Sequence, residues 1–302
     1  MKTVLITGAN AGLGKETAKQ LGEIEHIEKI LLGCRNLTKA RQAKAELTAI
    51  TGRDIYDIVN IDVSNLDSVR MAVAALPYSV DGLIMNAGGT GGRAFSKLTD
   101  AGVTQIVAVN LLGHAVLTEE LLKAQKLNSV AIYAGSEAAR GVKEMGMPRP
   151  NFPKSSIQEF IELCQGKRFA SQSDATVPYG PIKYMAALWM GAMSRQYPKI
   201  RFVTMSPGAT TGTEGFDSLS LVRRTVMKSM MRVMLALGKV HKIDVGAKRF
   251  VDALLNSAYS TGTFYASKKG LTGEISDQST LFGDLADLDI QNNAKLALSH
   301  FM

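Results

Sequence analysis

The chain has 302 residues and a formal charge of +8, from 35 lysines and arginines against 27 aspartates and glutamates. Hydrophobic residues make up 46% and charged residues 21% of the chain, a balance that supports a folded core and excludes a disordered chain. Two cysteines and four scattered histidines exclude a disulfide framework, and we expect no metal site. The basic excess is compatible with nucleic acid, a membrane surface or an anionic cofactor, so its position along the chain has to discriminate among these partners.

The apolar stretch at the N-terminus is far too short for a signal peptide. No window approaches the roughly 20 apolar residues that a membrane helix needs. With Cys34 and Cys164 as free thiols, these features predict a cytoplasmic protein without a transmembrane segment.

Short β-branched runs alternate with longer helix-like segments along most of the chain. Because the expected strands are apolar along their whole length, we predict an α/β fold: a doubly wound parallel sheet of seven strands, covered by helices on both faces. No repeat, low-complexity tract or linker divides the chain, which indicates a single domain over residues 1–302. The predicted strands lie at about 2–7, 28–33, 55–61, 80–86, 128–134, 201–206 and 262–266, and the helices near 13–24, 37–51, 65–76, 98–126, 179–197 and 244–257.

Two segments interrupt this alternation. Residues 140–178 form a long insert that holds four of the chain's eight prolines. A loop of this length inside a compact domain is usually functional or mobile. Its middle, residues 155–163, has the pattern of a short capped helix. The second segment, residues 213–240, is basic and rich in methionine.

A glycine-rich turn follows the first predicted strand and opens a helix. Its sequence is Thr7-Gly8-Ala9-Asn10-Ala11-Gly12-Leu13-Gly14. Such a turn lets backbone N–H groups approach a phosphate at the positive end of the helix dipole, which indicates dinucleotide binding. Three glycines also occur in ordinary tight turns, and the spacing Gly-x-x-x-Gly-x-Gly differs from the more familiar Gly-x-Gly-x-x-Gly.

The end of the second predicted strand favours NADP(H) over NAD(H). A site for NAD usually has an acidic residue here, which accepts a hydrogen bond from the adenosine ribose. Cys34 stands at that position and Arg35 follows it. A guanidinium can bind a 2′-phosphate in bidentate fashion, whereas a carboxylate would repel it. The alternative is that Arg35 is a solvated charge at a strand end; Lys15 and Lys39 either add positive potential or are plain surface residues.

Tyr179 and Lys183 stand four residues apart, on one face of a predicted helix. A free phenol has a pKa of about 10, and a neighbouring ammonium lowers it toward values useful for proton transfer. Ser136 follows the fifth predicted strand, where its hydroxyl could hold a substrate oxygen near Tyr179. Each feature alone is common: Tyr-x-x-x-Lys occurs by accident, and serine is a routine helix cap.

In this combination the sequence resembles the short-chain dehydrogenase/reductase family. The resemblance spans residues 3 to about 213 and implies a seven-stranded Rossmann-type sheet with hydride transfer between nicotinamide and an alcohol or carbonyl carbon. It also implies roles: Tyr179 as general acid/base, Lys183 lowering its pKa and holding the nicotinamide ribose, Ser136 orienting the substrate, and Asn110 placing a water of the proton relay. The residues implied to bind the cofactor are Thr7, Gly8, Asn10, Gly12, Leu13, Gly14, Arg35, Asp62, Asn86, Ala87, Gly88, Tyr179, Lys183, Pro207, Gly208, Thr211 and Thr213.

The sequence departs from the family pattern at several positions. Ile182 stands before the lysine where the family often has serine, and Gly212 stands where a threonine usually contacts the nicotinamide amide. Thr211 and Thr213 flank that glycine, and either could take its place. The long insert and the sequence Cys34-Arg35-Asn36 are most similar to the branch that contains retinol dehydrogenases and protochlorophyllide reductases.

Most of the basic excess lies between residues 221 and 249, which hold eight basic residues and one acidic residue. Arg224, Lys228 and Arg232 recur at helical spacing, and several methionines fall mostly on another face. In the family, the equivalent region covers the substrate, so we expect a helical lid over residues 213–240. Its methionines would contact a bulky apolar substrate, and its basic face would meet solvent, acidic groups or a membrane surface. An ordinary amphipathic helix packed on the core is the alternative.

The sequence therefore predicts an NADP-dependent oxidoreductase that acts on a small-molecule alcohol or carbonyl compound. A protein on the same fold that senses NADP(H) without turnover is the alternative, although a sensor has no need of Asn110, Ser136, Tyr179 and Lys183 together. No recognised motif supports nucleic-acid binding. The family commonly pairs subunits through the helices near 98–126 and 179–197, and the insert could obstruct that pairing, so the oligomeric state stays open.

Overall fold

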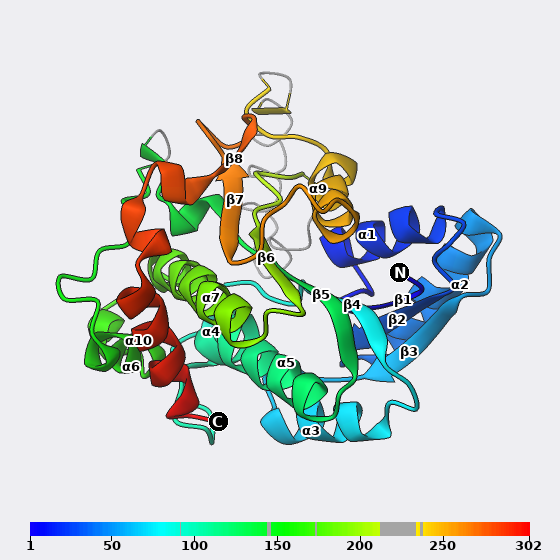
Figure 1. The fold of residues 1–302 in the computed structure, drawn as a ribbon, viewed down its shortest axis with the longest axis horizontal. Coiled ribbons are helices and arrows are strands. Elements are labelled where there is room, and N and C mark those ends of the chain that lie inside the picture. Colours follow the sequence, from blue (N-terminus) through cyan, green and yellow to red (C-terminus); the bar gives the residue numbers. More distant parts are fainter. Residues whose placement is uncertain (91, 144–145, 173, 212–233, 236–237) are drawn as a thin grey trace.

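The structure is a computed structural model that describes residues 1–90, 92–143, 146–172, 174–211, 234–235 and 238–302. In this described part, eight strands form one sheet in the order β3-β2-β1-β4-β5-β6-β7-β8 (Figure 1). Strands β1 to β7 pair in parallel, and β8 pairs antiparallel to β7. The strands are β1 Thr3–Thr7, β2 Lys29–Cys34, β3 Tyr56–Asn60, β4 Val80–Met85, β5 Leu127–Ala134, β6 Arg201–Met205, β7 Thr263–Ser267 and β8 Ile275–Asp277.

The predicted α/β fold is confirmed, but the prediction of seven strands, all parallel, is wrong by one strand. The additional strand β8 has three residues, Ile275-Ser276-Asp277, which are half-exposed. It closes a short hairpin after β7 that includes Gly270 at φ +61°. A strand this short has too few residues to show a period-2 pattern, and an antiparallel edge strand needs no apolar run.

Helices cover both faces of the sheet and bury two hydrophobic clusters. Helices α1, α2 and α9 pack on one face, whereas α3, α5 and α7 pack on the other (Figure 1). Alternate strand residues serve opposite faces: in β5, Tyr133 belongs to the α5 and α7 side, and Ile132 to the α1 and α9 side. The helices are α1 Gly12–Gly22, α2 Leu37–Thr51, α3 Leu66–Ala75, α4 Gln105–Val107, α5 Gly113–Lys123, α6 Ile157–Cys164, α7 Thr176–Gln196, α9 Ile243–Leu255 and α10 Leu288–Ser299.

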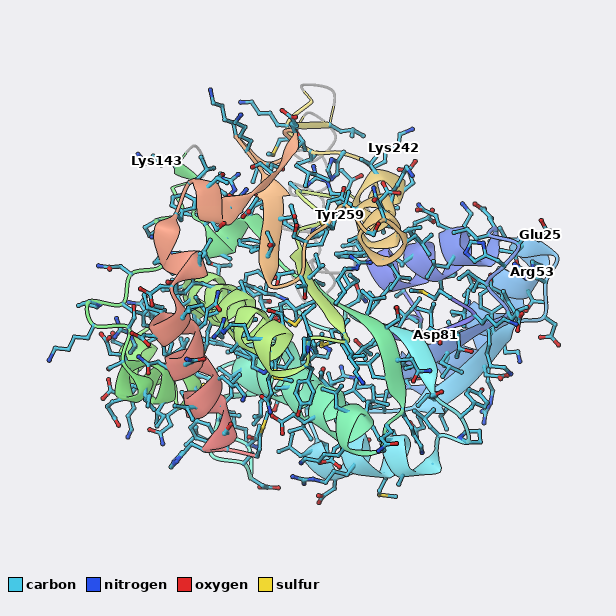
Figure 2. The ribbon with its side chains drawn as sticks, in the orientation of Figure 1. Glu25, Arg53, Asp81, Lys143, Lys242 and Tyr259 are labelled. Atoms are coloured by element: carbon cyan, nitrogen blue, oxygen red, sulfur yellow. The ribbon has the colours of Figure 1, made fainter. Side chains whose placement is uncertain are left out.

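Polar side chains tie the amino ends of the strands to the loops that lead into them. The carboxylate of Asp81 accepts the backbone N–H groups of Lys2 at 2.6 Å and Thr3 at 3.1 Å. The guanidinium of Arg53 donates to carbonyl oxygens of the loop between α1 and β2, including Ile27 at 2.7 Å (Figure 2). These contacts lie at the edge of the sheet opposite the carboxyl ends of the strands, where the candidate site lies.

The helix predicted over 98–126 is interrupted. Residues 98–104 form a turn closed by a bridge between Leu98 and Thr104, with Gly102 at φ +76°. The short α4 then leads into a π-helical turn, Ala108–Leu112, before α5 begins. The side chain of Asn110 donates to the Ile106 carbonyl at 2.8 Å and so inserts a second donor into the helical ladder. The periodicity of apolar residues indicates only that the segment is helical, and it does not reveal a π-helical turn within the helix.

The insert contains the capped helix that the sequence predicts. Helix α6 begins after Ser156, whose side chain accepts the Glu159 N–H while Glu159 closes a capping box. Phe152 and Phe160 anchor the insert in the core, with ring centroids 4.9 Å apart. The C-terminal helix α10, which we did not predict, packs against α7 together with α6 (Figure 1).

The predicted lid falls almost wholly outside the described residues, because 212–233 and 236–237 are not described. The expectations for its methionines and its basic face therefore stay predictions. Among the helices of the described segments, none has the length and apolar character that crossing a bilayer requires.

The burial of α5 and α7 predicts a monomer. Residues of α7 from Pro178 to Ser194 are almost all buried within the chain, as is most of α5. Two subunits that pair through these helices would need an exposed apolar face, and α6 and α10 of the same chain occupy the face of α7. Light scattering during size-exclusion chromatography should give the 32.4 kDa of one chain at all protein concentrations. A doubled mass would contradict this prediction.

Candidate active site

The predicted site residues gather at the carboxyl edge of the sheet. Gly8 directly follows β1, Asn86 follows β4, Ser136 follows β5 and Pro207 follows β6. Strand order reverses between β1 and β4, and ligands of doubly wound sheets bind in the crevice outside the strands at such a point. Motifs separated by up to 200 residues in the chain thus share one crevice.

The glycine turn has the backbone geometry that its sequence predicts. Gly8 and Gly12 adopt φ values of +68° and +55°, which only glycine takes without strain. A Cβ on Gly14 would collide with the carbonyl of Gly8, so the first turn of α1 packs tightly against the strand end. A Cβ on Gly12 would meet nothing within 4 Å, and Ala11 caps α1 without a side-chain hydrogen bond. The first N–H groups of α1 are therefore open toward the crevice, with Leu13 half-buried beside them.

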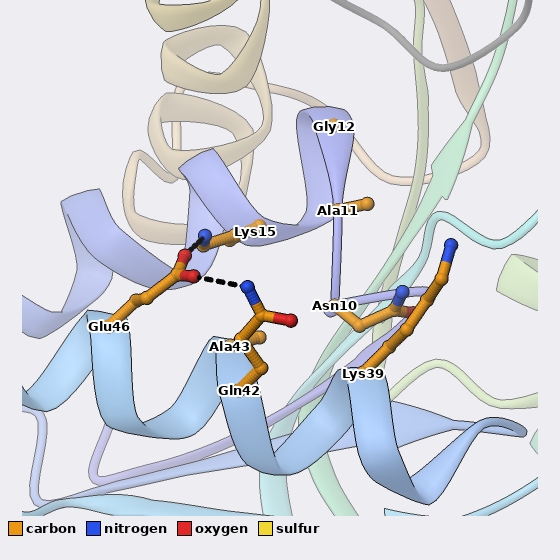
Figure 3. A pocket seen from close by; sticks show the side chains of 8 residues that line it. All are labelled: Asn10, Ala11, Gly12, Lys15, Lys39, Gln42, Ala43 and Glu46. Atoms are coloured by element: carbon orange, nitrogen blue, oxygen red, sulfur yellow. Dashed lines mark hydrogen bonds and ion pairs between the residues drawn. The ribbon is translucent and has the colours of Figure 1, made fainter. Parts of the chain in front are cut away.

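A pocket of about 300 Å³ lies between this turn and α2 (Figure 3). Lys15 lines it but forms an ion pair with Glu46, which also accepts a hydrogen bond from Gln42 at 2.8 Å. Lys39 extends past Asn10 in the same pocket. Among the described residues Lys39 has no ion-pair partner, so of the two lysines it is the one whose charge remains available.

The end of β2 has the neutral character that the sequence predicts. Cys34 is 1% exposed, and burial raises the pKa of its thiol to about 11, although nearby backbone groups of Ala9 and Asn10 act in the opposite direction. Arg35 is exposed at the rim of the crevice and has no ion-pair partner in the described chain. The arrangement places one free cation, and no carboxylate, directly after β2.

The loops after β3 and β4 complete the cofactor side of the crevice. Asp62 is held by Ser64, whose hydroxyl and N–H donate to one carboxylate oxygen at 2.7 and 2.9 Å. The amide of Asn86 donates to the Thr7 carbonyl at 2.9 Å, and the Thr7 hydroxyl accepts the N–H groups of Asn86 and Ala87. A Cβ on Gly88 would lie 2.6 Å from the Asn110 side chain, so only glycine permits this approach.

Asn110 is fully buried, and both its side-chain amide and its backbone carbonyl form hydrogen bonds. Its side-chain amide donates to the carbonyl of Gly89 at 2.7 Å and accepts the Gly89 N–H at 3.1 Å, which fixes the loop after β4. Its backbone carbonyl accepts the Tyr133 hydroxyl at 2.6 Å and a nitrogen of His114 at 3.3 Å. This backbone carbonyl of Asn110 belongs to the π-helical turn Ala108–Leu112.

The structure brings Tyr179, Ser136 and Lys183 together. Helix α7 carries the tyrosine and the lysine one turn apart, and the hydroxyl of Ser136 lies close enough to the phenol to favour its ionised form. The pKa of Tyr179 is nevertheless raised above 10.0, because burial outweighs the lowering effect of Ser136. The Lys183 nitrogen lies 5.5 Å from the centre of the phenol ring and donates its hydrogen bonds to other groups, so the expected lowering of the Tyr179 pKa by Lys183 stays a prediction.

Lys183 is 3% exposed, and burial lowers its pKa to about 7. Its ammonium donates to the carbonyl of Ala134 at 2.8 Å and to the hydroxyl of Tyr133 at 3.2 Å. The ring face of Tyr133 lies 4.6 Å from the same nitrogen, which adds a cation–π contact. Two acceptors and one ring therefore hold the ammonium beneath Tyr179.

The loop after β6 is fastened by His241. A ring nitrogen of His241 bonds to the Pro207 carbonyl at 2.7 Å, and Gly208 adopts φ +72° where a Cβ would crowd that ring. The Thr211 N–H donates to the His241 carbonyl at 2.9 Å. Thr213 lies outside the described residues, so the choice between Thr211 and Thr213 stays open.

Sequence reasoning missed a buried ionic cluster that supports this edge of the sheet. Glu137 follows Ser136 and accepts Arg140 at 2.6 Å and the Ser267 N–H at 3.0 Å. Arg249 of α9 lies 3.8 Å from the same carboxylate and donates to the carbonyl of Ser206. The cluster joins the ends of β5, β6 and β7. Arg140 is only three residues from Glu137, but Ser267 lies 130 residues from it in the chain, so no local spacing could have revealed the cluster.

Tyr133 and His114 were also missed. An aromatic residue in an apolar strand indicates core packing, and a histidine on a buried helix face indicates little more. His114 lies four residues after Asn110, and its other ring nitrogen is 3.1 Å from the Thr7 hydroxyl. Since Asn110 offers only a carbonyl, Nδ1 of His114 carries the proton and Nε2 accepts from Thr7.

The buried His114 predicts a loss of stability in acid. Burial lowers its pKa to about 3, whereas histidine in an unfolded chain keeps a value near 6.5. Between these values the unfolded state binds the additional proton, so the free energy of unfolding falls as the pH drops, by up to about 1.4 kcal/mol per pH unit from this group. His114→Gln should flatten the dependence in urea titrations, and His26→Gln at an exposed site should not. An unchanged slope in H114Q would contradict this explanation.

The crevice fits a nicotinamide dinucleotide. The uncapped N–H groups of α1 face open space at Gly12, at the positive end of a helix of 11 residues. An anionic pyrophosphate is the ligand that such a helix start favours. Thr7, Asn86 and Asn110 use their polar atoms on the backbone of this edge, which keeps the glycine turn rigid. Within the described chain, histidine, cysteine and carboxylate groups do not gather into a metal site.

Comparison with known proteins identifies the family. The model of the short chain dehydrogenase family matches residues 2–146. Protochlorophyllide reductase from Avena sativa is 31% identical over 232 residues, which cover 69% of this chain and 72% of that protein. Retinol dehydrogenase 11 from Mus musculus is 33% identical over 129 residues, 41% of this chain and 39% of that protein. Both kinds of relative were expected from the sequence around Cys34 and from the insert, and the expectation is confirmed.

Other similarities agree with this result. Protochlorophyllide reductase B from Oryza sativa subsp. japonica is 33% identical over 233 residues, 70% of this chain and 56% of that protein, and the chain spans a little over half the length of the first curated relatives it matches. The L-sorbose reductase structure from Gluconobacter frateurii shares the fold, with a TM-score of 0.64 at 17% identity over 89% of this chain and 96% of that one. The order of the motifs along the chain, their meeting at one edge of the sheet and these relatives together show that the chain belongs to the short-chain dehydrogenase family.

Proposed function

We propose that the protein is an NADP(H)-dependent oxidoreductase that transfers a hydride between nicotinamide and the alcohol or carbonyl carbon of a small molecule. The observation that carries this proposal is the convergence of Ser136, Tyr179 and Lys183 beside an open glycine turn. We take residues 1–302 as one catalytic domain. The proposed substrate is bulky and apolar, on the strength of the methionines in segment 213–240, and contact of its basic face with a membrane surface is part of the same proposal. The two buried free thiols fit a reducing cytoplasm.

Three residues of the chain carry out the proposed proton transfer, each with a separate role. The bound nicotinamide would supply or accept the hydride. Tyr179 donates the proton to the carbonyl oxygen in reduction and takes it back in alcohol oxidation, while the Ser136 hydroxyl orients that oxygen. The raised pKa of Tyr179 keeps the phenol protonated at neutral pH, which is the form that reduction requires. The ammonium of Lys183 stabilises the phenolate that remains after proton donation.

Preference for NADP(H) rests on Arg35. Cys34 offers no carboxylate to a ribose hydroxyl, since its buried thiol stays neutral with a pKa of about 11. Arg35 is exposed and free of ion pairs within the described chain, and Lys39 adds a second cation near Asn10. Lys15 contributes less positive potential at the pocket than its position suggests, because it forms an ion pair with Glu46. The chicken carbonyl reductase structure, at 18% identity, is described as NADPH-bound, which is compatible with this preference.

Tyr179→Phe should abolish turnover and leave cofactor binding intact. Removal of the proton donor should lower kcat by at least about 100-fold, in a screen of aldehydes and ketones of graded size with NADPH. Tyr184→Phe is the matched control, because Tyr184 lies on the same helix and its hydroxyl bonds to Asp284 at 2.6 Å, outside the crevice. Unchanged turnover in Y179F would overturn the mechanism. NADPH binding by a wild-type protein that turns over no substrate would instead support a sensor.

Arg35→Glu should reverse the cofactor preference. Loss of a charge-assisted contact and the new repulsion should weaken NADPH binding by about 10- to 100-fold and leave NADH binding equal or stronger. Fluorescence titration with each cofactor measures both affinities. Arg70→Glu on α3 is the control for the change in net charge, since Arg70 pairs with Asp67 on the opposite helical layer. A wild-type preference for NADH would refute the argument from Arg35.

A further inference from the structure

Tyr133 occupies a position that packing alone does not explain. It lies in β5, three residues before Ser136, and is 0% exposed within the core on the side of α5 and α7. A buried phenylalanine would fill the same space. The Tyr133 hydroxyl, however, bonds to two groups of the candidate active site, the Asn110 carbonyl at 2.6 Å and the Lys183 ammonium at 3.2 Å.

We propose that Tyr133 is a positioning residue of the reaction: its hydroxyl links the ammonium of Lys183 to the carbonyl of Asn110 and so holds the lysine beneath Tyr179. This inference rests on the function proposed above. The hydroxyl accepts one N–H of the ammonium and donates its own proton to the carbonyl, which uses both of its hydrogen-bonding capacities. The ring of the same residue lies against the ammonium at 4.6 Å.

The acceptor of this link is itself held in place. The carbonyl of Asn110 lies in the π-helical turn and also accepts Nδ1 of His114 at 3.3 Å. His114 in turn accepts the hydroxyl of Thr7, the first residue of the glycine turn, at 3.1 Å. A continuous chain of hydrogen bonds therefore runs from the dinucleotide turn to the catalytic lysine, and Tyr133 is its last member.

The acid–base properties of these groups mean that Tyr133 positions the ammonium and does not transfer a proton to the substrate. Burial raises the pKa of its phenol well above 10.0, so the hydroxyl keeps its proton throughout the working range. A backbone carbonyl cannot pass a proton onward, which closes this route to proton exchange. The titratable groups that face Lys183 are Tyr179, Tyr133 and His114, and no carboxylate lies within ion-pair distance among the described residues.

The test is Tyr133→Phe, which keeps the ring and removes one acceptor from the ammonium. We expect kcat for carbonyl reduction to fall about tenfold at neutral pH, with KM for the substrate changed less than twofold. Because Lys183 with fewer acceptors loses its proton more readily, the alkaline limb of the pH profile of kcat should move about one pH unit lower. A core-packing role would lower stability alone and would not move this limb.

Tyr184→Phe is the matched control. Like Tyr133, Tyr184 is a buried tyrosine with a bonded hydroxyl, and it directly follows Lys183, but its partner is Asp284. Both variants should lose comparable thermal stability, and only Y133F should shift the pH profile. A profile in Y133F equal to that of Y184F and the wild type would overturn the inference. If Y133F fails to fold, 4-aminophenylalanine at position 133 keeps the ring and a donor to the Asn110 carbonyl while offering the ammonium a weaker acceptor, and should move the limb in the same direction.

A second measurement is independent of turnover. The pKa of Lys183 is about 7 in the folded chain and 10.5 when exposed, so the unfolded state binds the additional proton between these values and stability rises with pH there. In Y133F this rise should begin about one pH unit lower in urea titrations, and in Y184F it should not. Absence of turnover in the wild type would refute the proposed function and the catalytic part of this inference. Normal turnover with unshifted curves in Y133F would refute this inference alone.

Discussion

The hydroxyl of Thr7 is the contact on which the rest of the site depends. It accepts the backbone N–H groups of Asn86 and Ala87 at 2.9 and 3.0 Å, which joins the ends of β1 and β4 where the strand order reverses. At that point the crevice opens because the two strands lead in opposite directions across the sheet. One side-chain oxygen of β1 accepts both N–H groups that follow β4, so the walls of the crevice keep a fixed separation.

From this contact a series of hydrogen bonds extends through the candidate site. Through His114 it reaches the Asn110 carbonyl, and through Tyr133 it reaches Lys183. On the far side, Glu137 and Arg249 hold the ends of β5, β6 and β7 together. Burial of such charges is costly unless every partner is supplied, and each of these groups has several. Several hydrogen bonds to each of these groups hold the site in place, and a rigid site can position a proton donor to within a fraction of an ångström.

The elements that could be predicted from the sequence are those with local causes. Apolar strands, glycine turns and the capping box at Ser156 each depend on neighbours within a few residues, so their patterns are visible in the chain. Strand β8 and the π-helical turn lack such a pattern: one is too short, and the other arises when Asn110 bonds to Ile106 and to the loop at Gly89. The raised pKa of Tyr179 was equally inaccessible, because its sign depends on how deeply the phenol is buried.

The sequence alone determined which residues the candidate site is built from: a serine after one strand, a tyrosine and a lysine one helical turn apart, a glycine turn, and a cysteine followed by an arginine where an acid would select NAD. These features survive any small change in packing, since they depend on residue identity and local spacing. Only the tertiary structure decided what holds that chemistry in place. Tyr133 bonds to Lys183, 50 residues away in the chain, and His114 to Thr7, 107 residues away, while Arg249 pairs with the similarly distant Glu137; such contacts exist only once the strands have paired and the crevice has formed.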